Sequence, residues 1–452
     1  MRHRTYVLAV LFWLSVFNST DNVALALVLQ NIKLDLSLTD TELGVLTGIA
    51  FALFYSLVGL GVARWADRGD RVAIISATAV VWSVLVAACG TVTNFVQLFL
   101  LRVGIGIGEA GYFPASQSLI ADYFDRDERP RATAILVTAA GVTYLIGYGV
   151  AGWLNELYGW RIMFAMLGMP GLAVAALAWL TLREPRFESS HSNIVARFSF
   201  AARSLRKTTA AASASPRLKD VAITLWSNRT LRQLLFFITA SSFVTAGISR
   251  WQPSFFVRSH GLASGELGTY FALACGIGGG VGPLLGGMWA SHYAANNERL
   301  QLRVAGGVWC GMTILSGSMY LIPNYHIVFG LFGLQMVATT GIFGPFWAIV
   351  QTLVPQTMRA TAVAVFMLVG NLLGTGLGPL VAGLLSDALR ARFGEESLRY
   401  ALLLLSSGFL WTAWHLWQAS RYVSRDLALP HVGQGGHRCE GHASNTSSTV
   451  AL

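Results

Sequence analysis

Three charged residues interrupt long apolar stretches of this chain: Asp21, Arg102 and Glu109. Charged side chains at hydrocarbon depth are costly, so they mark candidate functional sites. Glu109 follows Arg102 by about two helical turns, which places both on one helix face ~10.5 Å apart. Asp21 and Arg102 lie about 8 and about 7 residues from the same side of a bilayer, counted at ~1.5 Å per helical residue. We therefore expect an Asp21–Arg102 ion pair with Glu109 deeper.

One cation between two carboxylates can exchange partners. A carboxylate that loses its arginine in a dry cavity takes up a proton, and one that faces the arginine releases it. The first interpretation is that Asp21 and Glu109 alternate as proton carriers while Arg102 attracts an anionic group of a solute. The alternative is a static ion pair that orients two helices.

Five further polar residues lie in apolar stretches and are candidates to line a cavity. They are Asn18, Asn22, Arg250, Gln335 and Asn371. For the four amides, the alternative role is hydrogen bonding between helices. For Arg250, it is a long side chain that reaches toward the membrane surface.

The composition indicates the elements that must position these residues. The chain has 452 residues, of which 54% are hydrophobic and 12% charged, whereas soluble domains carry about 25% charged residues. The apolar residues form runs of about 18 or more, enough to cross a bilayer. Arg131-Ala132-Thr133-Ala134 recurs as Arg359-Ala360-Thr361-Ala362, which indicates two related halves. We predict an all-α polytopic membrane protein with twelve transmembrane helices in two pseudo-symmetric six-helix bundles.

Changes in composition place the domain boundaries. We expect an N-terminal bundle over 1–182, a basic linker over 183–232 and a C-terminal bundle over 233–419. The Gly-, His- and Ser-rich tail, 420–452, is expected to be disordered.

The charge pattern predicts the orientation. The net charge is +10, but the basic residues lie in alternate loops and in the linker, as the positive-inside rule predicts, and not in a nucleic-acid-binding patch. Both termini are therefore expected in the cytoplasm, in a bacterial inner membrane. The loop 387–399 fits poorly, because its arginines fall on the outer side.

The sequence contains no nucleophile–base set, metal-ligand cluster or nucleotide-binding loop in a suitable context, so we expect no enzyme activity, cofactor or metal. Gly104 to Gly111 contains a formal GxGxxG. It lies inside an apolar span without a βαβ context, where small residues instead allow close helix packing.

A charged cluster follows the second apolar span and includes Asp67, Arg68 and Arg71; Arg131 and Arg359 occupy corresponding places in the two halves. These five residues are candidates for a cytoplasmic gate, in which Asp67 meets the positive N-terminus of a helix from the other half. The alternative is a solvated turn that only sets orientation.

Asp67-Arg68-Gly69-Asp70-Arg71 resembles the loop 2–3 signature of the major facilitator superfamily, with Ala63 and Asp70 in place of two glycines. Within it, the first half is most similar to Spinster-like transporters and their bacterial relatives. The residues that carry this resemblance are Val45 to Gly48, Phe51 to Tyr55, Gly108 to Gly111, Asp122 to Phe124 and Arg183 to Pro185.

The resemblance implies that Asp21, Arg102 and Glu109 act in coupling and substrate binding, because they fall on the positions implicated in that family. One departure is Asn22, where the family usually has Arg. The superfamily's antiporter motif is missing from the fifth span, so antiport is not inferred.

The expected function is secondary active transport by alternating access, coupled to protons. The expected partners are an amphipathic solute, either lysolipid- or sphingolipid-like or an organic anion, and membrane lipids; nucleic acid is not expected, and the chain is expected to act as a monomer. The alternatives are an uncoupled facilitator and a ligand sensor that does not transport.

Overall fold

The computed structural model describes residues 2–66, 69–125, 128–185, 218–295, 297–355 and 358–428, which are helical apart from short connections. The first half contains α1 (Arg2–Leu36), α2 (Asp40–Thr47), α3 (Ile49–Ala66), α4 (Arg71–Ala88), α5 (Phe95–Glu109), α6 (Tyr112–Tyr123), α7 (Arg129–Tyr144), η2 (Leu145–Val150) and α8 (Ala151–Thr181). The second half contains α10 (Leu218–Ser227), α11 (Arg229–His260), α12 (Ser264–Tyr293), α13 (Glu298–Met319), α14 (Tyr325–Leu353), α15 (Arg359–Val369), η6 (Gly370–Thr375), α16 (Gly376–Phe393), α17 (Ser397–Ser406) and α18 (Gly408–Ala428).

These helices supply the predicted membrane crossings. In the described part of the chain, nine helical stretches are long and apolar enough to span a bilayer. Two of them, Arg131–Thr181 and Thr361–Leu427, are long enough to cross twice. The chain turns at Gly159 and Gly394, whose φ angles of 81° and 59° favour glycine. With α13, which runs beside α18, the described residues form the twelve crossings that the sequence predicts.

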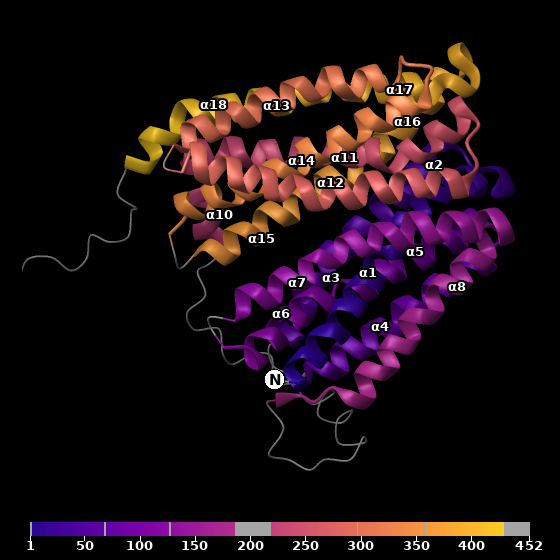
Figure 1. The fold of residues 1–452 in the computed structure, drawn as a ribbon, viewed down its shortest axis with the longest axis horizontal. Coiled ribbons are helices and arrows are strands. Elements are labelled where there is room, and N and C mark those ends of the chain that lie inside the picture. Colours follow the sequence, from indigo (N-terminus) through magenta and orange to yellow (C-terminus); the bar gives the residue numbers. More distant parts are fainter. Residues whose placement is uncertain are drawn as a thin grey trace, which may run out of the picture.

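The two halves form separate bundles that meet at one end (Figure 1). Helix α1 begins and helix α18 ends at the opposite end (Figure 1), which we call the terminal end; the end where the bundles meet is the distal end. Helices α2 and α16 pack together across the two halves, as do α12 with η2 and α8, and α1 with α11. The bundles therefore enclose a space that the distal contacts close.

Close backbone approach holds the distal contacts together. A Cβ at Gly48, at the break between α2 and α3, would lie 2.2 Å from the Gly376 carbonyl oxygen. A Cβ at Gly268 of α12 would lie 2.2 Å from the Tyr148 carbonyl oxygen of η2. Only glycine fits at such distances, so Gly48 and Gly268 are required for this packing.

Two π-helical segments interrupt related spans. Segment η2 follows α7, and η6 follows α15; α7 and α15 contain the repeated Arg-Ala-Thr-Ala sequence. π-Helical turns are rare and often occur at functional sites. Their occurrence in both halves supports the internal repeat.

The structure differs from the expected domain boundaries in two places. The second half begins with α10, inside the expected linker, where Val221 and Leu225 are buried. Helix α18 continues to Ala428, into the expected tail, because Val423 packs in the core and Asp426 accepts hydrogen bonds from Thr230. The rest of the expected linker, 186–217, and of the tail, 429–452, lies outside the described residues.

Candidate functional site

The Asp21–Arg102 ion pair that the sequence predicts is present. The Arg102 Nη1 donates to Asp21 Oδ2 at 2.6 Å, and Nη2 donates to Asn22 Oδ1 at 2.5 Å. Asp21 is 2% exposed and Arg102 is 1% exposed. The pair therefore joins α1 to α5 in the interior of the first half.

Glu109 lies near this pair without joining it. Asn22 Nδ2 is 3.4 Å from both Asp21 Oδ1 and Glu109 Oε2, so the amide lies between the two carboxyl groups. Glu109 Oε1 is buried and accepts no hydrogen bond from the described residues. A buried carboxyl oxygen without a donor is costly when charged and available to a proton.

The glycines of α5 allow this arrangement. A Cβ at Gly106 would lie 2.9 Å from the Phe51 carbonyl oxygen of α3, and one at Gly108 would lie 3.2 Å from Trp82 Cβ of α4. The apolar glycine run is thus a helix-packing surface, as expected from its sequence context, and it brings Glu109 close to α1 and α3.

A cavity of about 680 Å³ lies between the two halves and contains Glu109 in its wall. Helix α1 contributes polar side chains to this wall, whereas α12 and α14 contribute mainly apolar ones. The polar residues of α1 are Ser15, Asn18, Ser19 and Asn22. The apolar residues of α12 and α14 are Phe271, Phe332, Met336 and Phe343. The cavity is therefore amphipathic.

The cavity collects four of the five additional polar candidates. Asn18, Asn22, Arg250 and Asn371 line it, the last from the π-helical segment η6. Gln335 does not line it; this side chain is buried on α14, and its backbone oxygen accepts a hydrogen bond from Thr339. Arg250 Nη1 donates to the Asn22 carbonyl oxygen at 2.7 Å, which connects α11 of the second half to α1 of the first.

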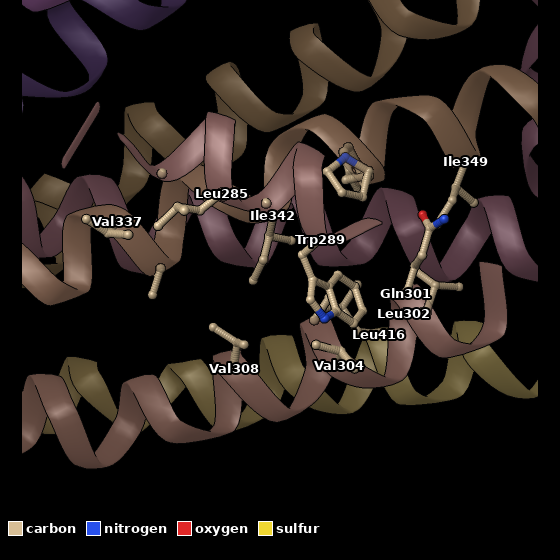
Figure 2. A pocket seen from close by; sticks show the side chains of 17 residues that line it. Leu285, Trp289, Gln301, Leu302, Val304, Val308, Val337, Ile342, Ile349 and Leu416 are labelled. Atoms are coloured by element: carbon tan, nitrogen blue, oxygen red, sulfur yellow. The ribbon is translucent and has the colours of Figure 1, made fainter. Parts of the chain in front are cut away.

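A second cavity, of about 310 Å³, lies within the second half between α12, α13, α14 and α18. Figure 2 shows its wall, in which Leu285, Trp289, Val304 and Val308 are apolar and Gln301 is an exception. Its wall contains none of the charged and amide residues that the sequence proposes as site residues.

Charged residues close the distal end, and sequence reasoning missed this role for them. Asp40 of α2 is 1% exposed and accepts hydrogen bonds from Arg258 of α11 at 2.6 and 2.8 Å. Lys33 and Ser386 also donate to the Asp40 carboxylate. The apolar context of Lys33 and the position of Asp40 just before an apolar run were the available signals, but they do not reveal a partner 218 residues away.

A second distal contact is a helix cap between the halves. Asp387 of α16 accepts hydrogen bonds from the backbone N–H groups of Asp40 and Thr41, at the start of α2. A carboxylate at a helix N-terminus satisfies free N–H groups and interacts favourably with the helix dipole. This is the kind of contact that the sequence predicted for Asp67 at the other end of the molecule.

Three of the predicted cytoplasmic gate residues, Arg71, Arg131 and Arg359, lie in the described part of the chain, and their recorded contacts do not join them to one another. Asp67 and Arg68 lie outside the described residues. Arg71 is buried within the first half, where it bonds to Glu184 and Asp122. Arg131 is exposed, and Arg359 donates to the Val354 carbonyl oxygen.

A family model for the Major Facilitator Superfamily matches residues 11–379. The chain belongs to this superfamily. Its members' architecture, two helical bundles with a site between them, agrees with the cavity described above. The chain is accordingly a secondary transporter and not an enzyme.

Three of the curated relatives each match more than four fifths of this chain. An MFS-type efflux pump of Mycolicibacterium smegmatis is 29% identical over 428 residues, covering 92% of this chain and 93% of the relative. A probable galactarate/D-glucarate transporter of Escherichia coli is 24% identical, covering 86% and 89%. Protein spinster homolog 1 of Xenopus tropicalis is 25% identical, covering 89% and 78%.

A similar solved structure is that of a bacterial homolog of the human lysosomal transporter Spinster, in an inward-facing, unoccupied conformation. It has a TM-score of 0.77 and 27% identity, and the match covers 94% of this chain and 98% of that one. The Spinster-like resemblance of the sequence is thereby confirmed.

Proposed function

We propose that this transporter couples the movement of an amphipathic organic solute to protons, with Glu109 as the proton carrier. The observation that carries the proposal is the environment of Glu109. It is 2% exposed, lines the central cavity and has a carboxyl oxygen without a hydrogen-bond donor among the described residues. Arg102, the nearest cation on its own helix face, is bonded to Asp21.

Asp21 and Arg102 act with Glu109 as a switch. In the present conformation, Arg102 holds Asp21 as an anion and leaves Glu109 to the proton. Movement of Arg102 toward Glu109 displaces that proton and frees Asp21 to accept one. Asn22 lies within hydrogen-bond distance of all three side chains, so it provides a polar link during the exchange.

The proposed orientation places the terminal end in the cytoplasm, according to the positive-inside rule. The distal contacts of Asp40 and Asp387 then close the outer side, and the conformation is inward-facing. Alternating access requires these contacts to break while the terminal ends of the bundles approach each other. Asp67, Arg68, Arg71, Arg131 and Arg359 are the candidates for the contacts formed there.

The amphipathic wall supports the proposed class of solute. A polar head fits against α1, and an apolar body fits against α12 and α14. Names of relatives, which include a Spinster homolog and a sugar-acid transporter, are compatible with a lysolipid-like solute and with an organic anion. We propose that the protein works as a monomer in a bacterial inner membrane.

The test is a pH change inside proteoliposomes loaded with a pH-sensitive dye, in a screen of lysolipids and amphipathic organic acids. Wild-type protein is expected to move protons with a transported solute, and Glu109→Gln is expected to abolish that proton movement. Glu298→Gln is the matched control, because Glu298 starts α13 away from the cavity. Solute uptake without a pH change would support the uncoupled facilitator, and binding without uptake would support the sensor.

A further inference from the structure

Two charged side chains lie in the described wall of the central cavity, one from each half: Glu109 on α5 and Arg250 on α11. Sequence reasoning gave Arg102 the task of attracting an anion. Arg102, however, is 1% exposed, is bonded to both Asp21 and Asn22, and does not line the cavity. An anion in the cavity therefore meets Arg250 first.

Arg250 has donors to spare. A guanidinium group carries five N–H donors. One of them is used for the Asn22 carbonyl oxygen, and Arg250 forms no other hydrogen bond with a described residue. Its side chain is half-buried and lies in the cavity wall. The planar donor fork matches carboxylate, phosphate and sulfonate groups.

Arg250 and Glu109 contact the same residue. Arg250 bonds to the Asn22 carbonyl oxygen, and the Asn22 amide reaches Glu109 Oε2. An anion bound to Arg250 therefore lies beside Glu109. Two negative charges held close together in a partly buried site repel each other, so the anion binds more tightly when Glu109 carries a proton. By reciprocity, the bound anion also favours proton uptake.

Other groups that face Glu109 do not remove this effect. Asp21 on α1 and Arg102 on α5 compensate each other as an ion pair. Helix α3 contributes the uncharged Tyr55 to the same wall. Between Val72 and Ala88, α4 carries no charged residue, and Asp122, at the far end of α6, bonds to Arg71.

We infer that Arg250 is the anion-binding residue of the cavity and that the solute is an amphipathic anion that binds together with a proton on Glu109. This inference rests on the proposed proton-coupled function. It adds that solute and proton favour each other's binding and do not compete. Anion and proton occupy the cavity together, as in symport. A cationic solute would compete with the proton.

Equilibrium binding to the purified full chain tests the inference without transport. The probe is a dansyl-labelled dodecyl sulfonate, because its charge is constant at mildly acidic and mildly alkaline pH. The dansyl-labelled alkyl alcohol of equal length is the uncharged comparison. We expect sulfonate affinity to rise by about tenfold from the alkaline to the acidic condition, a typical size for coupled sites, and alcohol affinity to stay constant.

Variants distinguish the role of Glu109 from that of Arg250. Glu109→Gln should bind the sulfonate tightly at both pH values, because the amide resembles the protonated acid. Arg250→Gln should weaken sulfonate binding by about tenfold or more while it retains alcohol binding, which also verifies that the variant is folded. Arg250→Lys should be intermediate. Arg303→Gln, on the exposed face of α13, is the matched control and should behave as wild type.

Tighter sulfonate binding at alkaline pH, or equal binding by Arg250→Gln and Arg303→Gln, would overturn the inference. The proton-transport assay in vesicles and the binding assay can give negative results independently of each other. If binding depends on Arg250 and pH as expected but no solute moves protons, the anion site remains and proton-coupled transport is rejected. If protons move with a solute but binding ignores Arg250, only the present inference is rejected.

Discussion

Arg102 forms its ion pair with Asp21, at 2.6 Å, and not with Glu109, although Glu109 shares its helix. Both charges of this pair are almost completely buried. Removing one partner of a buried pair leaves an uncompensated charge, which costs much more than removing both. Single and double substitutions of the two residues can therefore test whether the pair is buried away from water.

Asp21→Ala is therefore expected to destabilise the protein by about 3–5 kcal/mol, measured as a lower melting temperature in detergent. The double variant Asp21→Ala, Arg102→Met should recover much of that loss, because no buried charge is left without a partner. Transport should be absent from both variants. Equal melting temperatures for the single and the double variant would mean that water reaches Arg102 and that the pair is not dry.

Glu109→Gln is expected to have the opposite profile, with little loss of stability and a complete loss of proton coupling. The amide has nearly the shape of the protonated acid, and no buried charge or packing volume is altered. The free energy of unfolding should therefore change by less than about 1 kcal/mol. Melting temperature and vesicle pH change, measured on the same preparation, check this prediction. A large stability loss would indicate that Glu109 is a structural anion.

The distal contacts predict how the conformation responds to mutation. Arg258→Gln removes the arginine that bridges the halves at Asp40, so the distal end should open more often. The distance between spin labels at Leu34 and Arg392, which are exposed on opposite halves, measures this in a background without native cysteines. A longer distance population is expected. Arg421→Gln, exposed on α18, is the control, and identical distance distributions for the two variants would contradict the proposed role of Asp40.

A substitution of glycine by alanine tests the closure of the distal end without changing a charge. Gly268→Ala places a methyl group against the backbone of η2, so it should destabilise the closed distal end by about 1–3 kcal/mol and lengthen the distance between the same labels. Gly280→Ala in the same helix is a matched control, because its Cβ would have no atom within 4 Å. Equal effects of the two substitutions would show that α12 and η2 separate freely.

The sequence predicted the parts of the molecule that depend on hydropathy and helical period. Counting residues along helices predicts the number of membrane crossings and the two related halves. It also predicts that Asp21 and Arg102 lie at a similar depth in the bilayer. Contacts between the halves could not be predicted in this way. Arg258 and Asp40 are ordinary charges near span ends, and their pairing depends on how two bundles tilt against each other.

The assignment of Arg102 as the anion-binding residue illustrates the same limit. Depth within the bilayer was predicted well enough to pair Arg102 with Asp21, but depth does not reveal which side of a helix faces the cavity. Arg250 was a candidate for the cavity wall, with a side chain that reaches toward the membrane surface as the alternative, and its distance from the helix end does not decide between the two. The bond to the Asn22 backbone and the position of Arg250 among the lining residues favour the cavity wall.

The ratio of proton entry to solute uptake, measured in the same proteoliposomes for a solute found in the screen, tests the central claim most directly. The account predicts a fixed, nonzero ratio for wild-type protein over a range of solute gradients, and a ratio of zero for Glu109→Gln with binding retained. Uptake by wild-type protein with no proton movement, or an unchanged ratio in Glu109→Gln, would contradict it.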